Sequence, residues 1–165
     1  MSTNNNLAII AAMTPRHVIG LNNKLPWKIP QELQYFKQVT MGKVMIMGKN
    51  TFASMNMKGL PGRQTIVLSS QLKLTPTPER VEIAPSLEQA LELAHKHNPQ
   101  EIMIVGGSSI YQQFLPLVNK LYLSIIHQEY AGDSYFPKLD WSSWQFVEEQ
   151  EYPEFTTKVF ERKNE

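Results

Sequence analysis

Leu7-Ala8-Ile9-Ile10-Ala11-Ala12-Met13 is an unbroken apolar run near the start of the chain. A strand with one solvated face alternates apolar and polar residues, whereas a strand covered on both faces does not. The run therefore predicts a strand that is buried on both faces. Further strands are predicted at 43–47, 101–105 and 120–126, which are also rich in apolar residues.

Helical and extended segments alternate along the first two-thirds of the chain. The remaining predicted strands and the helices complete this alternation and end in an antiparallel hairpin. The order of elements predicts an α/β fold with a mixed, mostly parallel sheet and helices on both faces. The predicted segments are helices at 30–39, 50–55, 87–95 (capped by Ser86) and 108–114, strands at 18–20, 64–69 and 81–83, a turn and loop at 132–137, and hairpin strands at 144–147 and 155–160.

The composition indicates one globular domain, residues 1–165, that begins with a polar tail at 1–6. The 42% of apolar residues and 19% of charged residues are ordinary for such a domain. The net charge of +1 gives no electrostatic reason to expect binding to nucleic acid or to a membrane surface. The chain has no cysteine, which excludes disulfides, thiolate metal sites and cysteine nucleophiles.

Segments that direct a chain to a membrane are also missing from the sequence pattern. The first residues lack the charge and the apolar core of a signal peptide, and no apolar run is long enough to cross a bilayer. A chain without cysteine is compatible with the cytoplasm. We therefore expect a cytoplasmic protein.

Three predicted strands end in residues that suit an anionic ligand. Gly48-Lys49-Asn50-Thr51, Ser69-Ser70-Gln71 and Gly106-Gly107-Ser108-Ser109 combine glycines, hydroxyls and a cation. Ligands of parallel sheets bind beyond the carboxyl ends of the strands, where glycine lets the backbone approach a phosphate closely. The three ends together favour one ligand with several phosphates. Each segment alone is equally typical of a tight turn.

A carboxylate stands at the start of the first predicted helix, after a loop that contains Pro26 and Pro30. Glu32 lies four residues before Phe36, so the two side chains share a helix face. A carboxylate beside an aromatic ring is costly to bury unless something binds it, which favours a ligand site near Trp27. The alternative is a first-turn glutamate that the helix dipole stabilises, with Trp27 and Phe36 in the core.

The other candidate polar residues support fewer interpretations. Arg63 follows a Pro-Gly turn and could bind a ligand carboxylate in a bidentate way, or could be a surface arginine. His95 and His97 lie near a helix end, where cations are favoured, and the spacing of further metal ligands is absent. His17 and His127 stand without a GxSxG motif, which makes hydrolase chemistry a poor interpretation.

Taken together, the chain closely resembles the dihydrofolate reductase family, of the bacterial chromosomal type, from Leu7 to about Lys163. The fold that this resemblance implies has eight strands in the sheet. The order and spacing of several short motifs carry the resemblance: Ile19-Gly20, Leu25-Pro26-Trp27, Pro30-Gln31-Glu32-Leu33, Val44-Met45-Ile46-Met47-Gly48-Lys49-Asn50-Thr51, Leu60-Pro61-Gly62-Arg63, Ile104-Val105-Gly106-Gly107 with Tyr111, and Gly132-Asp133 with Phe136-Pro137.

The resemblance implies reduction of 7,8-dihydrofolate to 5,6,7,8-tetrahydrofolate by NADPH, which supports one-carbon metabolism and thymidylate and purine synthesis. Hydride would pass from nicotinamide C4 to pterin C6, with protonation of N5. Glu32 would be the acid of the pterin pocket, Ser124 would place a hydroxyl behind it, and Trp27 would hold an ordered water. Arg63 would bind the carboxylate of the glutamate tail. The other substrate-binding residues implied are Ile10, Ala11, Ala12, Leu33, Phe36, Met55, Leu60, Val105 and Tyr111.

The resemblance also implies a cofactor site and a partner list. Residues 21–25 would belong to a mobile loop over the nicotinamide, the peptide bond between the two glycines of the Gly-Gly pair would be cis, and no metal would be bound. Antifolate inhibitors would occupy the substrate site, and the chain would be a monomer. The residues implied for NADPH are Ala12, Ile19, Gly20, Asn23, Leu25, Gly48, Lys49, Asn50, Thr51, Leu68, Ser69, Ser70, Gln71, Val105, Gly106, Gly107, Ser108, Ser109, Ile110 and Tyr111.

Three positions depart from the commonest bacterial pattern. The pocket acid is Glu32 where most bacterial members have aspartate, and Ser109 stands where many carry an arginine near the cofactor. Residues 56–59 contain one extra residue at the lip of the substrate cleft. A related pterin or riboflavin-pathway reductase and a nonenzymatic nucleotide-binding module are the alternative functions; the Trp27 and Glu32 pair argues against the former.

Overall fold

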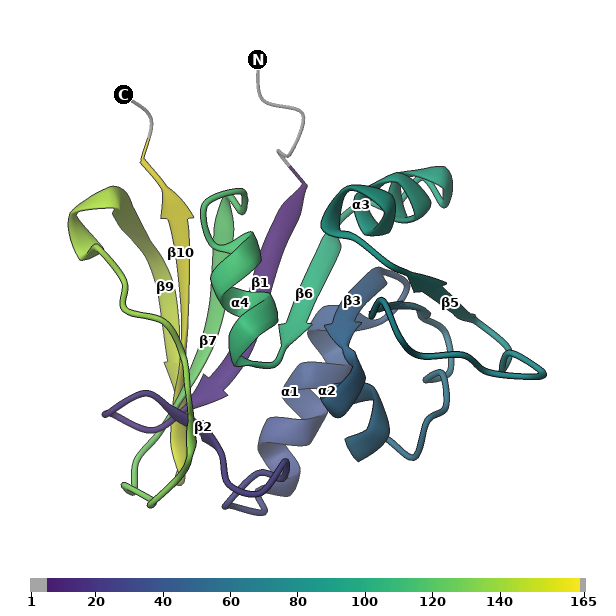
Figure 1. The fold of residues 1–165 in the computed structure, drawn as a ribbon. Coiled ribbons are helices and arrows are strands. Elements are labelled where there is room, and N and C mark those ends of the chain that lie inside the picture. Colours follow the sequence, from purple (N-terminus) through teal and green to yellow (C-terminus); the bar gives the residue numbers. More distant parts are fainter. Residues whose placement is uncertain (1–5, 164–165) are drawn as a thin grey trace.

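The computed structural model describes residues 6–163, and its central element is β1 (Leu7–Met13), as Figure 1 shows. Strand β1 lies between two parallel neighbours in an eight-stranded sheet of order β5-β4-β3-β6-β1-β7-β10-β9. Only the pairs β7–β10 and β10–β9 are antiparallel. The other strands of this sheet are β3 (Val44–Gly48), β4 (Gln64–Leu68), β5 (Val81–Ala84), β6 (Ile102–Gly106), β7 (Lys120–Ile126), β9 (Trp144–Glu151) and β10 (Phe155–Arg162).

Helices cover both faces of the sheet, so the side chains of β1 divide between two cores. Leu7 and Ile9 belong to a core that includes residues of α3 (Leu87–Lys96) and α4 (Ser108–Phe114). Ala8 and Ile10 belong to the opposite core, with residues of α1 (Pro30–Thr40) and α2 (Lys49–Ser54). This double cover explains the unbroken apolar run and confirms the predicted α/β architecture.

The helix starts follow from local chemistry. Pro30 occupies the first turn of α1, where its missing amide hydrogen is not needed. Ser86 caps α3 by accepting a hydrogen bond from the amide of Gln89 at 3.2 Å. Helices α2 and α4 begin instead after Gly48 and Gly107, which provide no side-chain cap. Both helices begin at the carboxyl edge of the sheet, directly after β3 and close behind β6.

A second, two-stranded sheet corrects one prediction. Residues 132–137 were predicted as turn and loop, but β8 (Ser134–Tyr135) pairs antiparallel with β2 (Val18–Gly20). Two residues are too short to carry a strand signal, and their pairing partner lies over a hundred residues away. The pair fixes the position of the loop that follows β2.

The C-terminal hairpin was predicted correctly, but its first strand is longer than 144–147. Strand β9 continues to Glu151 because β10 supplies hydrogen-bonding partners along its whole length. Most residues of β9 are exposed on the sheet edge, so its Glu- and Gln-rich second half shows no apolar signal. A short 3-10 helix, Trp141–Ser143, precedes it. The predicted tail at 1–6 lies outside the described residues except for Asn6, whose carbonyl accepts a hydrogen bond from Ile102 N at 2.8 Å.

Phe114 is the last residue of α4, and its ring is completely buried. Its replacement by alanine should therefore strongly destabilise the fold. Loss of a buried phenylalanine side chain costs about 3–5 kcal/mol. Phe146→Ala is the matched control, since Phe146 is 52% exposed and its loss should change stability far less. Urea unfolding of both variants measures the difference. Equal losses would contradict the assignment of Phe114 to the core.

Candidate functional site

A cavity of about 930 Å³ opens at the carboxyl ends of β1, β3, β4 and β6. This edge was predicted as the ligand site, and most of the predicted site residues do line the cavity. The predicted residues that line the cavity are Ile10, Ala11, Ala12, Ile19, Gly20, Asn23, Leu25, Glu32, Leu33, Phe36, Gly48, Lys49, Asn50, Thr51, Met55, Leu68, Ser69, Ser70, Val105, Gly107, Ser108, Ser109, Ile110 and Tyr111.

The cavity has an apolar half beneath α1. Its apolar lining residues include Leu33 and Phe36 of α1, Met55 after α2, Ile10 of β1 and Val105 near the end of β6. A flat, largely apolar ring system with one polar edge would suit these walls. The polar feature available at that edge is the carboxyl group of α1.

Glu32 is that carboxyl group, and it is only 6% exposed. Burial raises the pKa of Glu32 from 4.5 to about 7, because a charged carboxylate is poorly solvated among apolar side chains. The Ser124 hydroxyl lowers the pKa by less, although Ser124 Oγ meets no partner at ordinary hydrogen-bond geometry among residues 6–163. The carboxyl group can therefore exchange a proton near neutral pH and can bind a protonated heterocycle when ionised.

Trp27 and Ser124 were predicted to act together with Glu32, but neither lines the cavity. Trp27 is buried, and its indole Nε1 has no hydrogen-bond partner within the described part of the chain. Trp27 packs against Tyr130 with ring centroids 5.8 Å apart. An indole donor and a serine hydroxyl that lack protein partners are groups that an ordered water or a ligand would satisfy.

Tyr111 joins the ends of the two central strands. Its hydroxyl lies 2.8 Å from Ile10 O and 2.9 Å from Val105 O, so its single proton is shared between two carbonyl groups. Burial raises the pKa of Tyr111 far above its usual value. The ring also closes the space above Gly106, where a side-chain carbon would meet Tyr111 atoms at 3.1 Å. The Tyr111 hydroxyl therefore keeps β1 and β6 together at the cavity floor.

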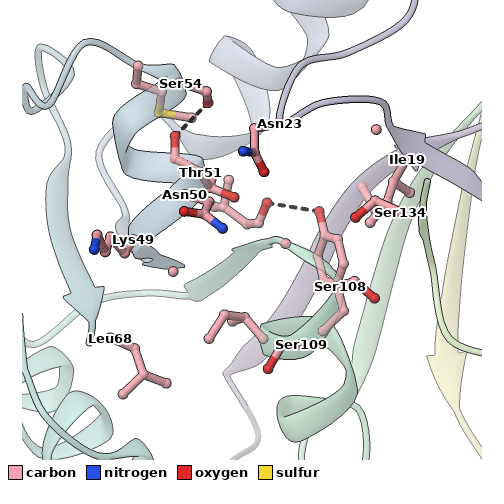
Figure 2. Close-up of a pocket in the computed structure, with 18 of the residues that line it drawn as sticks. Ile19, Asn23, Lys49, Asn50, Thr51, Ser54, Leu68, Ser108, Ser109 and Ser134 are labelled. Carbon is pink, nitrogen blue, oxygen red and sulfur yellow. Dashed lines mark hydrogen bonds between the residues drawn. The ribbon is translucent and has the colours of Figure 1, made fainter. Parts of the chain in front are cut away.

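The polar half of the cavity contains the groups that suit phosphates. Figure 2 shows Lys49, Asn50 and Thr51 at the start of α2 facing the same hollow as Ser108 and Ser109 at the start of α4. Two glycines precede α4. Gly106 has a φ of +115°, and its peptide bond to Gly107 is cis, as the resemblance implied. The Lys49 cation, several hydroxyls and the glycine backbone make this half suitable for a phosphorylated ligand.

Ser109, which stands where many members of the family carry an arginine, is joined by a second polar residue, Gln113. Ser109 Oγ accepts a hydrogen bond from Gln113 Nε2 at 3.2 Å, and both residues line the cavity. The segment in which an extra residue was expected contains a turn, where Asn56 and Met57 both have positive φ, 63° and 55°. Neither departure closes the cavity.

The loop over the cavity is attached to the segment between β7 and β8. Asn22 N donates to Asp133 Oδ2 at 3.1 Å, and Asp133 N donates to Gly20 O at 2.9 Å. Further back, Glu129 accepts hydrogen bonds from Thr14 Oγ1 at 2.6 Å and from Arg16 N at 2.9 Å. Ile19, Gly20, Asn23 and Leu25 are thereby placed in the cavity wall.

Four other predicted residues do not line the cavity. Leu60 packs against the core on the α1 side, Gln71 is an exposed turn residue bound to Ser69 Oγ, and Gly106 lies behind the wall. Arg63 is not the surface arginine that its sequence position also allowed, because it is only 6% exposed. Its Nη1 donates to Thr40 Oγ1 at 3.2 Å, and its Nε donates to Pro61 O at 3.0 Å, which places the guanidinium at the end of α1.

Sequence reasoning missed several lining residues. The strand-end rule would have found the segment after β5, had the position of β5 beside β4 been known. Ser134 enters through the unpredicted pairing of β8 with β2, and Gln113 lies one turn into α4. The missed residues are Lys24, Ser54, Pro85, Ser86, Leu87, Gln113 and Ser134.

Comparison with known proteins gives a consistent result. A sequence model described as dihydrofolate reductase matches residues 6–162. The dihydrofolate reductase type 3 of Salmonella typhimurium is 39% identical over 147 residues, which are 89% of this chain and 88% of that protein. The dihydrofolate reductase of Haemophilus influenzae is 41% identical over 145 residues, 88% of this chain and 86% of that protein.

A solved structure has the same fold. The dihydrofolate reductase from Enterococcus faecalis complexed with NADP(H) and RAB-propyl superposes with a TM-score of 0.84. The two chains share 32% sequence identity, and the match covers 96% of each. No helix among residues 6–163 has the length and hydropathy needed to span a membrane.

The buried acid predicts how stability depends on pH. Because the pKa of Glu32 is raised from 4.5 to about 7, the folded state holds this proton more tightly than the unfolded state. The protonated form therefore stabilises the fold at low pH, and that contribution is lost as the pH rises from about 4.5 to 7. Glu32→Gln removes this dependence, so its stability relative to the original chain should increase over the window, by up to roughly 3 kcal/mol.

Urea unfolding of both proteins without ligands, at several pH values, tests this linkage. Glu88→Gln is the control, since Glu88 is an unburied first-turn glutamate of α3 whose removal should change the pH dependence little. A stability difference between Glu32→Gln and the original chain that stays constant with pH would refute the shift.

Proposed function

The chain belongs to the dihydrofolate reductase family, and we propose that its cavity reduces 7,8-dihydrofolate to 5,6,7,8-tetrahydrofolate with NADPH as the reductant. The observation that carries this proposal is a buried carboxyl group, Glu32, which is the only acid among the described residues that line the cavity, and the other half of that cavity suits phosphates. An acid in that position matches the amino and NH edge of a pterin ring. The relatives from Salmonella typhimurium and Haemophilus influenzae are named dihydrofolate reductases, which supports this proposal.

The apolar half would hold the pterin. Phe36, Leu33 and Met55 would pack against its faces, and the ionised Glu32 would accept hydrogen bonds from its ring edge. Removal of water from this half strengthens that pairing, since charge interactions are stronger in an apolar environment. Ser124 and Trp27 would hold an ordered water beside the acid. This water would provide the hydrogen-bond partner that Trp27 Nε1 and Ser124 Oγ lack among the described residues.

The polar half fits NADPH. Lys49 and Ser70 would face the 2′-phosphate, Thr51 the remaining phosphates, and the close backbone at Gly107 the pyrophosphate. When bound, the cofactor supplies the hydride for pterin C6. The protein holds the two rings face to face at the ends of β1 and β6, and the loop attached to Asp133 excludes water from them.

Glu32 would control protonation of the pterin without donating the proton to N5 itself. It faces the ring edge away from N5, so a water would be the direct donor. Its raised pKa, about 7, lets it shift between the protonated and ionised forms at the pH of the reaction. The negative form stabilises a protonated pterin and so promotes hydride transfer.

We propose that the active unit is a monomer. We also propose that antifolates occupy the pterin half, that the protein acts in the cytoplasm, and that it takes no nucleic acid partner. The direct test of the function is the loss of the NADPH absorbance band when dihydrofolate is added. Tight NADPH binding without oxidation would instead favour a nucleotide-binding module.

Arg63 is proposed to bind the glutamate carboxylate of dihydrofolate. Its buried guanidinium is held by neutral partners and keeps donors for a carboxylate. Arg63→Ala should raise KM for dihydrofolate about tenfold or more, since a charged hydrogen bond contributes ~1.5–3 kcal/mol. KM for a dihydropterin without the tail should change little. Equal losses for both substrates would show that Arg63 is only structural.

Replacement of Glu32 tests the catalytic proposal. Glu32→Gln keeps the shape and removes the charge, so kcat at neutral pH should fall by ~10²–10⁴, the range of general acid–base catalysis. The loss should shrink at lower pH, where free dihydrofolate becomes protonated in solution. NADPH affinity, measured by fluorescence titration, should stay nearly unchanged. Activity within a few-fold of the original chain at neutral pH would assign this role to another residue.

A further inference from the structure

A second hollow, of about 310 Å³, lies at the opposite edge of the sheet from the reductase cavity. Its wall comes from the residues just before or at the start of β3, β4, β5 and β6. We call it the amino-edge hollow. Its size is at the lower limit of small-molecule sites, large enough for a pyrophosphate or a short run of carboxylates. The side chains used below are Lys43, Arg63, Arg80 and His97.

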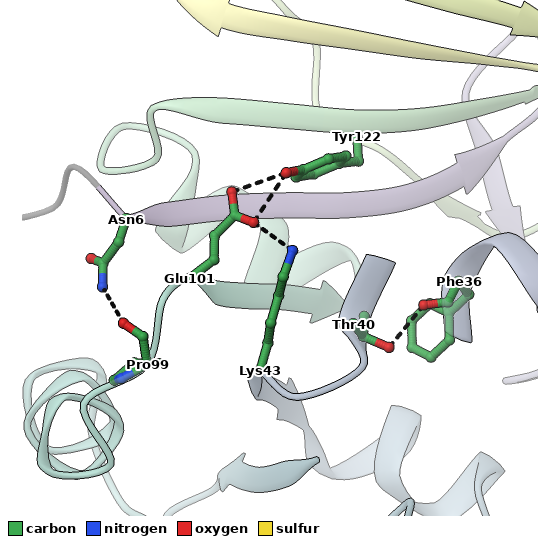
Figure 3. Close-up of polar contacts among 7 residues, drawn as sticks. All are labelled: Asn6, Phe36, Thr40, Lys43, Pro99, Glu101 and Tyr122. Carbon is green, nitrogen blue, oxygen red and sulfur yellow. Dashed lines mark hydrogen bonds and ion pairs between the residues drawn. The ribbon is translucent and has the colours of Figure 1, made fainter. Parts of the chain in front are cut away.

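The ionisable residues that line the amino-edge hollow are all basic. It contains these four basic side chains and no acidic one. Two of the four are already paired with acids outside the lining. Lys43 Nζ contacts Glu101 Oε1 at 2.7 Å, a pair that Tyr122 joins in Figure 3, and His97 Nε2 lies 2.6 Å from Glu82 Oε1.

Arg63 is the third, and it is buried without a counter-charge. The hydroxyl of Thr40 and the carbonyl of Pro61 accept its two hydrogen bonds to protein, and both acceptors are neutral. Among the described residues, no carboxylate lies within 4.0 Å of its guanidinium. Burial also lowers its pKa, which reflects the cost of an uncompensated buried charge. An anion at Arg63 would offset that cost.

Arg80 is the fourth, and its protein partner is weak. Its only ion pair in the described range is with Glu79 at 4.0 Å, and that carboxylate is 89% exposed. An exposed pair at this distance contributes little. Arg80 has a positive φ of 62°, an uncommon conformation for a non-glycine residue, immediately before β5. Arg80 lines the hollow, and among the described residues its guanidinium has no ion pair closer than this one.

We propose that the amino-edge hollow is an anion-binding site, in which Arg63 and Arg80 hold a phosphate chain or a cluster of carboxylates. Guanidinium groups bind both kinds of anion in a bidentate way. Two such groups at one hollow, without a carboxylate in its lining, favour a ligand with two or more negative charges over a single carboxylate.

The site shares Arg63 with the tail-binding role, so two sources of anion are possible. One is a free polyanion, which would compete with the tail of dihydrofolate at Arg63. The other is the acidic end of the substrate itself, extended past Arg63 toward Arg80. The choice between these sources rests on the proposed function, whereas the existence of the anion site does not.

Calorimetric titration with pyrophosphate tests the site directly. The protein is first saturated with NADPH, so that the cofactor half of the cavity cannot bind the probe. Arg80→Gln should weaken pyrophosphate binding about tenfold or more. Lys138→Gln is the control, because Lys138 is exposed, lies outside both hollows and changes the net charge equally. Absence of millimolar binding, or equal affinity in both variants, would overturn the proposal.

Steady-state kinetics then distinguishes the sources. A free-anion site predicts that pyrophosphate raises KM for dihydrofolate in the original chain, and much less in Arg80→Gln, with no effect on a dihydropterin that lacks the tail. A tail site predicts that Arg80→Gln alone raises KM for dihydrofolate. If neither KM moves, Arg63 is not shared and that part of the proposal is wrong. If dihydrofolate is not reduced at all, the proposed function fails while the titration still decides the anion site.

Discussion

The double burial of β1 is the constraint on which the rest of the structure depends. A strand that is covered on both faces by helices has no exposed position for a polar side chain along its length. The two hollows of the described residues accordingly lie beyond the strand ends, one at each edge of the sheet. Because β3 and β6 lie on one side of β1 and run parallel to it, their glycine-containing ends meet at one edge. The reductase cavity is a consequence of this arrangement.

Within that cavity, one unfavourable burial gives the site its chemistry. Glu32 is an ionisable group among apolar walls. Trp27 and Ser124, which lie outside the lining, carry buried polar atoms that have no hydrogen-bond partner among residues 6–163. Such groups reduce stability in the absence of a ligand and increase the affinity for one that can pair with them. The domain tolerates this cost because its two cores on either side of β1 are almost entirely apolar.

The sequence predicted the features that depend on local pattern. The buried strands, the four helices and the Ser86 cap follow from periodicity and capping, and the residues at strand ends follow from the rule for parallel sheets. Features that depend on which segments meet were not predictable in this way. Pro85 and Leu87 line the cavity only because β5 pairs with β4, and Ser134 does so because β8 pairs with β2. The sequence position of Arg63 favoured a surface arginine, because nothing in its turn shows that the guanidinium contacts Thr40 at the end of α1.

Helix α1 runs from the carboxyl edge of the sheet to its amino edge. Its length therefore sets how far apart two groups of one ligand must be to contact both ends of the helix. Its first turn carries Glu32, and its last residue, Thr40, fixes the guanidinium of Arg63. An α-helix of 11 residues is about 16 Å long. A ligand that reaches both groups must therefore be an extended molecule with a ring at one end and an anion at the other. If Glu32 and Arg63 bind the substrate as proposed, a pterin alone pairs only with Glu32 and a free anion at Arg63 does not reach Glu32, so the spacing along α1 favours a substrate that combines a ring and an anion.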